Sequence, residues 1–284
     1  MARDSWAHTV VRLDSRRDRA DERPRRTTPL PAQGVGWSAS FPVVSVSGSL
    51  PPVCVLAGGR GTRLGPLTAT LPKPLLRVAG RPFVEHQLEL LRAKGASRVV
   101  LCIGYLGELI EQTLGDGSRF GLELCYSRDG PRLLGTAGAV RRALPLLGDE
   151  FLVLYGDTYL RIDYADVARA FRASSLPALM TVLQNRGAWG RSNARYADGR
   201  ILGYDKSNPP AGADWIDYGL LAFHRGVFQE SALADVADLT AELADRQLLA
   251  GYPASERFYE IGDPRALAET EQFLTEARGE GRDS

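Results

Sequence analysis

The sequence has few of the residues that build disulfide frameworks or metal sites, with three cysteines and three histidines in 284 residues. The cysteines form no CxxC pair and no histidine cluster accompanies them, so neither a disulfide-rich fold nor a zinc module is expected. Cys54, Cys102 and Cys125 lie in or beside apolar runs. Because free cysteine packs as a small apolar side chain, we expect reduced core residues here, with metal binding as the weaker alternative.

Long apolar runs and an excess of one charge sign are also missing. No run approaches the ~18 residues of a membrane span, and the N-terminus has no apolar core of a secretory signal. The formal net charge is +1, which provides no electrostatic attraction to nucleic acid or to an anionic membrane. We therefore expect a cytoplasmic protein with no nucleic-acid or membrane partner.

The first 50 residues differ in composition from the rest. Residues 1–26 contain eight arginines and five acidic residues among very few apolar ones. Such a segment cannot bury enough surface to offset its chain entropy, and its acidic residues argue against a transit peptide. We expect a disordered or loosely attached tail over residues 1–50, one domain over residues 51–278 and a short tail over residues 279–284.

From residue 52 onward, short apolar runs alternate with segments of helical periodicity. Strands are expected at 53–57, 98–104, 122–127, 151–157, 178–184 and 215–225, with a hairpin at 194–206 turning at Asp198-Gly199. Helices are expected at 81–95, 106–117, 136–144, 163–173, 227–237, 240–249 and 263–277. This alternation predicts an α/β fold, a Rossmann-like three-layer sandwich with a mostly parallel central mixed sheet. Ligands are expected at the carboxyl ends of its strands.

A glycine-rich segment, LAGGRGTRLGPLTATLPKP, occupies residues 56–74 at the end of the first predicted strand. Glycines there let the backbone approach an anion and turn its N–H groups toward it, and Arg60 and Arg63 add cationic donors. The segment lacks the Gly-Lys-Ser/Thr of a P-loop, and Arg63 replaces the last glycine of a dinucleotide fingerprint. We expect a nucleoside triphosphate as the ligand; for the glycines alone, a plain strand-to-loop turn is the alternative.

The whole segment resembles the signature of the sugar nucleotidyltransferases, or NDP-sugar pyrophosphorylases, which join a nucleoside triphosphate to a sugar 1-phosphate and release pyrophosphate. Four later segments resemble the family's nucleoside and sugar pocket, its metal-binding strand end, its sugar-phosphate lysine and its second metal carboxylate: LGTAGAV (134–140), LYGDT (154–158), YDKS (204–207) and FYEIGDPRAL (258–267). The resemblance covers residues 52 to about 273. It is greatest to the single-domain sugar-1-phosphate guanylyl- and uridylyltransferases.

The resemblance implies a role for each matching residue. Arg63 and Lys73 would be catalytic, acting on the departing pyrophosphate and on the reacting phosphates. Asp157 and Glu260 would coordinate Mg²⁺ as the cofactor. The sugar phosphate would be bound by Lys206, Asp217 and Gly138. The nucleotide would be bound by Leu56, Ala57, Gly58, Gly59, Gly61, Thr62, Gly135, Thr136, Ala137 and Gly138. The implied partners are a nucleoside triphosphate and a sugar 1-phosphate, and a homo-oligomer is compatible with the sequence.

Lysine is rare, and its positions support two of these roles. Only Lys73, Lys94 and Lys206 occur among 35 basic residues. An ammonium binds phosphate as a compact point charge, unlike the planar fork of arginine, and two of the three lysines stand in the motifs. Lys94, before Gly95, needs no more than a favourable interaction with a helix C-terminus.

Two departures from the family pattern leave alternatives open. Glu260 stands where an aspartate is usual, and Asp217 stands where many relatives carry an asparagine that contacts the sugar. We expect GTP and a mannose- or heptose-type 1-phosphate as substrates. The alternatives are a cytidylyltransferase for a small alcohol phosphate such as phosphocholine, and a catalytically silent subunit that binds nucleotide sugars. Taken singly, Asp157 could cap a turn, and Glu260 and Lys206 could be solvated surface groups.

Overall fold

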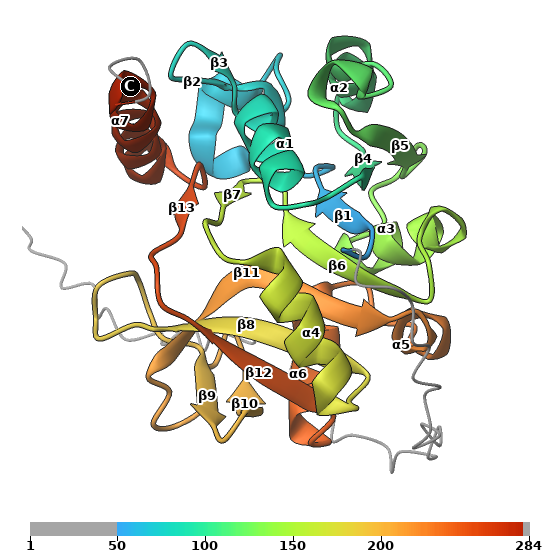
Figure 1. Ribbon diagram of the computed structural model, residues 1–284, viewed down its shortest axis with the longest axis vertical. Helices are drawn as coiled ribbons and strands as arrows, with labels where there is room; N and C mark the ends of the chain where they lie inside the picture. The colour runs from blue at the N-terminus through green and yellow to red at the C-terminus, as the bar shows by residue number, and fades with distance from the viewer. Residues whose placement is uncertain (1–49, 281–284) are drawn as a thin grey trace, which may run out of the picture. The chain divides into compact units, whose positions relative to one another are not determined.

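The computed structural model describes residues 50–280, so nearly all of the expected N-terminal tail and residues 281–284 lie outside the described residues. Figure 1 shows the order of the elements along the chain. Their core is a nine-stranded mixed sheet in the order β5-β4-β1-β6-β11-β8-β12-β10-β9.

The first half of the sheet is parallel, as the sequence predicts. It consists of β5 (Glu123–Arg128), β4 (Arg98–Ile103), β1 (Val53–Leu56) and β6 (Glu150–Tyr155). In the register, Leu56 lies beside Cys102 on one side and Tyr155 on the other. The carboxyl ends of these strands therefore lie at one edge, where the glycine-rich segment and the LYGDT segment leave the sheet.

The second half of the sheet is not mostly parallel, and the expectation is wrong there. β11 (Trp215–His224) is antiparallel to both β6 and β8 (Ala178–Gln184), whereas β12 (Leu249–Ala254) is parallel to β8. β10 (Arg200–Tyr204) is antiparallel to β12 and to β9 (Ala194–Ala197), which also pairs with β11. A tight turn joins β9 to β10 and makes this pair antiparallel. The partners in the pairs β6–β11, β8–β11 and β10–β12 lie far apart in the sequence, so tertiary packing sets the direction of these strands. The predicted turn is confirmed: Asp198 and Gly199 both have positive φ, 49° and 74°.

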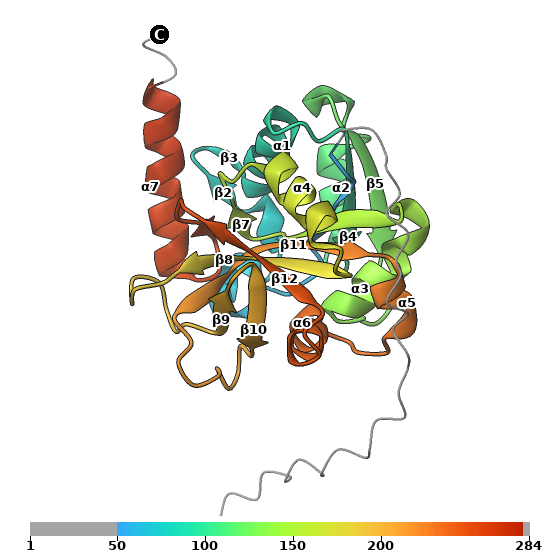
Figure 2. The same cartoon turned by 60° about the horizontal axis from the view of Figure 1, so that its bottom comes forward.

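Helices cover both faces of the sheet, which gives the expected three layers (Figures 1 and 2). One face carries α1 (Phe83–Ala93) and α4 (Tyr164–Ser174). The other carries α3 (Thr136–Ala143), α5 (Gly226–Glu230) and α6 (Val236–Asp245). The remaining longer helices are α2 (Gly107–Leu114) and α7 (Pro264–Glu280). Short 3-10 helices lie at Thr62–Thr68, Lys73–Leu75, Ser118–Phe120 and Leu144–Leu146.

Two expected helices near residues 227–249 differ from those observed. α5 ends at Glu230. The segment that follows it contacts the start of α3, where the backbone N–H groups of Ala137 and Gly138 donate to the Ala234 carbonyl. Residues 249–254 form β12, because the chain turns at Gln247, whose φ is 59°. Both differences arise from long-range contacts that override local helical periodicity.

Two pairs of short strands form separate two-stranded sheets. β2 (Arg77–Val78) pairs with β3 (Arg81–Pro82), and β7 (Thr158–Tyr159) pairs with β13 (Tyr259–Glu260). After β13, the Asp263 carboxylate accepts hydrogen bonds from the backbone N–H groups of Arg265 and Ala266 and so caps α7. The capped start of α7 holds the closing segment of the chain next to β7.

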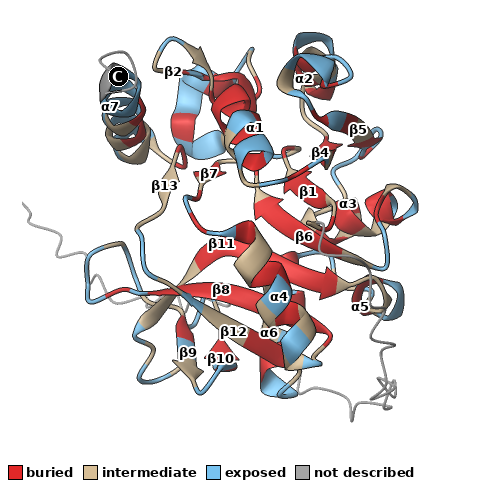
Figure 3. Cartoon of the chain, in the orientation of Figure 1, coloured by how far each residue is buried: buried red, intermediate tan, exposed pale blue. Residues whose placement is uncertain are grey.

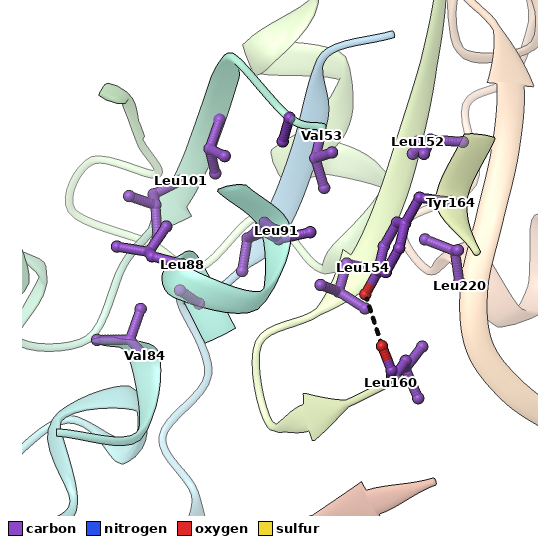
Figure 4. Packing of buried hydrophobic residues seen from close by; sticks show 14 of the residues in the cluster. Val53, Val84, Leu88, Leu91, Leu101, Leu152, Leu154, Leu160, Tyr164 and Leu220 are labelled. Carbon is purple, nitrogen blue, oxygen red and sulfur yellow. Dashed lines mark hydrogen bonds between the residues drawn. The ribbon is translucent and has the colours of Figure 1, made fainter. Parts of the chain in front are cut away.

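Burial is concentrated between the helices and the sheet (Figure 3). Figure 4 shows Val84, Leu88 and Leu91 of α1 facing the strand residues Val53 and Leu101, all of them fully buried. Cys54 and Cys102 are buried as expected, whereas Cys125 is half-buried, and all three are free thiols. Over residues 50–280, no helix combines the length and apolar character that crossing a membrane requires.

Leu88→Ala tests the packing of α1 on the sheet. Because Leu88 is 0% exposed within the main apolar cluster, we expect the free energy of unfolding to fall by about 2–5 kcal/mol, measured by urea denaturation. The matched control is Leu67→Ala, because Leu67 is 51% exposed and its loss should change stability by less than about 0.5 kcal/mol. Equal effects of the two substitutions would contradict this packing.

Candidate active site

A cavity of about 380 Å³ lies at the carboxyl ends of β1 and β6. It contains most of the residues that the sequence places in the nucleotide and catalytic sets. These are Leu56, Ala57, Gly58, Gly59, Gly61, Thr62, Arg63, Lys73, Gly135 and Thr136. The cavity also contains Asp157, which the sequence assigns to the metal pair. Ala137, Gly138, Lys206, Asp217 and Glu260 do not line this cavity; Glu260 lines a neighbouring cavity of about 770 Å³, which it shares with Arg63.

Two glycines of the loop after β1 have geometric reasons for being glycine. A Cβ on Gly58 would lie 3.0 Å from the backbone nitrogen of Gly104, so a side chain would push β1 and β4 apart. Gly61 has φ 64° and precedes the first 3-10 helix, a conformation that L side chains rarely adopt. A Cβ on Gly59 would meet nothing within 4 Å. The loop therefore leaves its backbone open at Gly59.

Lys73 and Asp157 meet in this cavity from distant parts of the sequence. Lys73 begins the second 3-10 helix, with Pro72 and Pro74 on either side, and Asp157 follows β6. The Lys73 Nζ donates to Asp157 Oδ2 at 2.6 Å, and the two side chains are 12% and 25% exposed. Both groups of this pair stay partly exposed, so the ammonium can contact a phosphate and the carboxylate can contact a cation.

Glu260 lies next to Asp157 because β13 pairs with β7. Glu260 is opposite Thr158, and the Ile261 N–H donates to the Asp157 carbonyl at 2.9 Å. Burial raises the pKa of the Glu260 carboxyl above its usual value and the charge of Asp157 raises it further, whereas Arg63 and Lys73 lower it. Two carboxylates are thus close enough to repel each other, which is the condition that a divalent cation relieves.

This pair fits Mg²⁺ by its chemistry. Magnesium is held in proteins by one or two carboxylates together with substrate phosphates and water. Asp157 and Glu260 supply such carboxylates, beside the loop expected to bind phosphates. Among the described residues, no group of three or more histidine, cysteine, aspartate or glutamate side chains is arranged to hold a metal.

Lys206 and Asp217 form a second charged centre. The Asp217 side chain is 3% exposed, and its Oδ2 lies 3.0 Å from Lys206 Nζ. The same oxygen accepts hydrogen bonds from the hydroxyls of Tyr204 at 3.0 Å and Tyr155 at 3.4 Å, while Oδ1 accepts from the Gly219 N–H. Asp217 is therefore held on all sides by the protein, and its carboxylate faces the lysine.

The same network controls the charge of Lys206. Lys206 Nζ also donates to the Tyr155 hydroxyl at 3.1 Å and lies 4.4 Å from the centre of that ring. Burial alone would lower the pKa of Lys206, but Asp217 and Tyr155 raise it above its usual value. Burial also raises the pKa of Tyr155 and of Tyr204, so both phenols stay protonated and donate. Lys206 remains a cation, with 42% of its side chain exposed.

Backbone N–H groups at the N-terminus of α3 already have hydrogen-bond partners within the protein. Ala137 and Gly138 donate their N–H groups to the Ala234 carbonyl at 2.7 and 3.2 Å. The Thr136 hydroxyl donates to Asp235 Oδ1 at 3.1 Å and accepts from the Val236 N–H. Ala137 is fully buried. Gly135 and Thr136 thus reach the cavity, whereas the N–H groups of Ala137 and Gly138 already have partners within the protein.

Sequence reasoning missed several residues of the site. Tyr155, Asp129 and Asp235 line the cavity, and Tyr204 holds Asp217. Tyr155 and Tyr204 belong to the motifs LYGDT and YDKS themselves, so their position gave a signal. Asp129 follows a predicted strand and could have been found in the same way as Asp157. Asp235 carried no signal, because only the fold brings it to α3.

The chain is similar to known nucleotidyltransferases. The family model described as Nucleotidyl transferase matches residues 53–276. An N-acetylmuramate alpha-1-phosphate uridylyltransferase of Neisseria meningitidis is 46% identical over 124 residues, 43% of this chain and 53% of that protein. A mannose-1-phosphate guanylyltransferase of Mycobacterium tuberculosis is 36% identical over 177 residues, 61% of this chain and 48% of that protein. The chain thus spans about half the length of these curated relatives.

The fold is shared with solved structures at lower identity. A crystal structure of HddC from Yersinia pseudotuberculosis has a TM-score of 0.67 to this chain at 21% sequence identity. The match covers 79% of this chain and 99% of that one. A likeness at this identity supports the same Rossmann-like α/β architecture.

The pH dependence of the free energy of unfolding, compared between wild type and Glu260→Gln, tests whether the second carboxylate is buried. Because the folded-state pKa of Glu260 lies above the ordinary glutamate value of 4.5, the folded protein binds this proton more tightly than the unfolded chain. The free energy of unfolding should therefore fall as pH rises from about 4.5 through the folded-state pKa. Chemical denaturation across pH 4–8 should show that Glu260→Gln removes this fall and stabilises the metal-free protein at neutral pH. Glu108→Gln, at an exposed position of α2, should keep the wild-type profile; a profile unchanged in Glu260→Gln would contradict the burial argument.

Proposed function

The chain belongs to the nucleotidyl transferase family, and on that basis we propose that it joins a nucleoside triphosphate to a sugar 1-phosphate and releases pyrophosphate. The observation that carries this proposal is the meeting of three groups at one edge of the sheet. They are the open glycine loop after β1, the Lys73–Asp157 pair beside Glu260, and Lys206 held by Asp217.

The proposed reaction needs no covalent enzyme intermediate. A phosphate oxygen of the sugar 1-phosphate attacks the α-phosphorus, and the bond from that phosphorus to the oxygen bridging to the β-phosphorus breaks. The bridging oxygen keeps the electron pair and leaves as part of pyrophosphate. Such a transfer requires positioning and neutralisation of charge more than proton transfer, which suits a site built from cations and carboxylates.

Each charged residue then has a proposed task. The backbone of Gly58, Gly59 and Gly61 holds the triphosphate, and Arg63 neutralises the departing pyrophosphate. Lys73 steadies the reacting phosphates when it exchanges its contact with Asp157 for one with a phosphate oxygen. Asp157 and Glu260 would hold Mg²⁺, which when bound supplies positive charge to the phosphate oxygens.

Lys206 and Asp217 have separate tasks in this proposal. Lys206 binds the phosphate of the sugar 1-phosphate with its exposed ammonium. Asp217 acts as a positioning residue, because its carboxylate is 3% exposed and faces Lys206 and two tyrosine hydroxyls. In this proposal Asp217, which stands where many relatives carry an asparagine, positions Lys206 and does not contact the sugar.

We propose GTP and a mannose- or heptose-type sugar 1-phosphate as the substrate pair. The similarity to a mannose-1-phosphate guanylyltransferase over 61% of the chain supports guanylyl transfer, while the similarity to a uridylyltransferase makes UTP the main competitor. Cytoplasmic location and a homo-oligomeric state stay predictions from the sequence.

The direct test is magnesium-dependent release of pyrophosphate by the purified protein. Each of GTP, UTP, CTP, ATP and dTTP is offered with a panel of sugar 1-phosphates and with phosphocholine. We expect release with one nucleotide and a sugar 1-phosphate, and a fall of at least 100-fold in Asp157→Asn, but not in the exposed turn variant Asp198→Asn. Release with phosphocholine alone would indicate the alcohol-phosphate cytidylyltransferase, and nucleotide binding without release would indicate the silent subunit.

Lys206→Gln tests the binding site of the sugar phosphate. Loss of a charged hydrogen bond of about 1.5–3 kcal/mol should raise the KM for the sugar 1-phosphate about 10- to 150-fold. The Kd for nucleotide, measured by calorimetry, should not change, because Lys206 does not line the nucleotide cavity. Lys94→Gln, at the end of α1, is the matched lysine control. A shift in nucleotide Kd with an unchanged KM would refute the assignment.

A further inference from the structure

Gln87 is a buried polar residue of α1 that has no part in the roles above. The stripe of α1 that packs on the sheet has the spacing i, i+3, i+4, i+7 and consists of Val84, Gln87, Leu88 and Leu91. Gln87 occupies a position of this stripe where an apolar side chain is expected, and it is 1% exposed. An amide buried in this way must find hydrogen-bond partners to offset the loss of water.

The Gln87 amide spans the turn that carries Asp157. Its Nε2 donates to the Thr158 carbonyl at 2.8 Å and to the Tyr155 carbonyl at 3.1 Å. Tyr155 ends β6 and Thr158 begins β7, so the two carbonyls bracket the turn residues Gly156 and Asp157. The helix α1 and the strand β7 lie side by side (Figure 1). One helix side chain thus holds both ends of the turn.

An amide is the group that this contact requires. Both neighbours of Gln87 are carbonyl oxygens, so the nitrogen end of the amide must face them, and its two N–H groups supply one donor to each. Within residues 50–280 the other end, Oε1, is buried and has no hydrogen-bond partner. An unpartnered buried acceptor lowers stability, so leucine or methionine would serve better if packing were the whole role. The unpartnered Oε1 therefore indicates that the two donors have a role of their own.

The rest of the turn is held from the sheet and from β13. The Gly156 N–H donates to the Leu56 carbonyl at 3.1 Å, and the Ile261 N–H donates to the Asp157 carbonyl at 2.9 Å. These bonds fix the backbone from two sides, and Gln87 fixes it from the side of α1. The Asp157 carboxylate reaches the cavity from this backbone, so the three sets of bonds together decide where it lies.

The second carboxylate of the metal pair is held from a different helix. Thr270 of α7 is fully buried, and its hydroxyl donates to the Glu260 carbonyl at 2.7 Å. Gln87 and Thr270 each act on the backbone of one carboxylate residue, and neither lines the cavity that contains Asp157. The separation of the two carboxylates therefore depends on the Gln87 contact at one end.

We propose that Gln87 is a positioning residue for the metal pair. Its two hydrogen bonds fix the turn between β6 and β7 and thereby set the Asp157 carboxylate for a divalent cation. The inference rests on the proposed function, which assigns Mg²⁺ to Asp157 and Glu260. Groups that orient a metal ligand contribute to metal affinity through the geometry they impose. Gln87 acts in this way through the backbone of the turn and touches neither the substrate nor the cation.

Gln87→Met tests this inference, because it keeps the length of the side chain and removes both donors. Binding of Mn²⁺, used in place of Mg²⁺, is followed by electron paramagnetic resonance with GTP or UTP and no sugar 1-phosphate, so that no transfer occurs. We expect the Kd for the Mn²⁺–nucleotide complex to rise about 10- to 100-fold. The Kd for nucleotide with a metal chelator present should keep its wild-type value, because Gln87 does not line the nucleotide cavity.

Gln87→Glu grades the effect. Burial favours the neutral carboxyl, which has one O–H donor where the amide has two. Its Kd for the Mn²⁺–nucleotide complex should lie between those of wild type and Gln87→Met. If thermal unfolding shows that Gln87→Met is not folded, Gln87→Glu decides the question, and an unchanged Kd in that variant would refute the positioning role.

Leu88→Ala is the matched control on the same helix. It should lower thermal stability and leave the Kd for the Mn²⁺–nucleotide complex unchanged, because Leu88 supplies packing and no hydrogen bond. An unchanged Kd in Gln87→Met, an equal rise in Leu88→Ala, or no binding of Mn²⁺–nucleotide by wild type would overturn the inference.

The same measurements keep the inference separate from the proposed function. If wild type releases pyrophosphate while Gln87→Met binds Mn²⁺–nucleotide as wild type does, the inference fails and the proposed function stands. If Gln87→Met weakens that binding while wild type releases no pyrophosphate with any sugar 1-phosphate, the proposed function fails and the positioning role stands.

Discussion

The parallel pairing of β1 with both β4 and β6 is the constraint on which the site depends. It brings Leu56 beside Cys102 and Tyr155, so three strands end at one level. The contact is close enough to require glycine, because a Cβ on Gly156 would lie 2.5 Å from the Leu56 carbonyl oxygen. The loops that leave these ends are thereby held close together, and the placement of the glycine loop and of Asp157 depends on that register.

The charges of the site are balanced within the protein before any substrate arrives. Lys73 is paired with Asp157, and Lys206 with Asp217, while Glu260 interacts with Arg63 and Lys73. Paired charges cost less to bury than isolated ones, which lets the fold keep several cations and carboxylates together. An anionic substrate with its cation can then exchange partners with these pairs, so the arrangement that stabilises the free protein also suits the proposed transfer of a nucleotidyl group.

The two halves of the sheet divide the proposed work. The parallel half ends in the glycine loop and the β5–α3 connection, where the nucleotide is proposed to bind. The antiparallel half contributes Lys206 after β10 and Asp217 on β11, and the pairing of β9 with β11 holds those strands together. Relatives with uridylyl- and guanylyltransferase names both resemble this chain.

The sequence by itself determined the elements whose signals are local. The periodicity of α1, the Asp198-Gly199 turn and the glycine loop before Lys73 each depend on neighbours a few residues away, and the loop also indicated the family. Only the tertiary structure decided the direction of the strands after β6, the early end of α5 and the strand β12. It alone brought Asp235 to α3, Glu260 to Asp157 and Asp129 to the edge of the cavity. The physical reason is that strand direction, caps and ion pairs between distant residues are set by which segments pack together, and no short stretch of sequence records that choice.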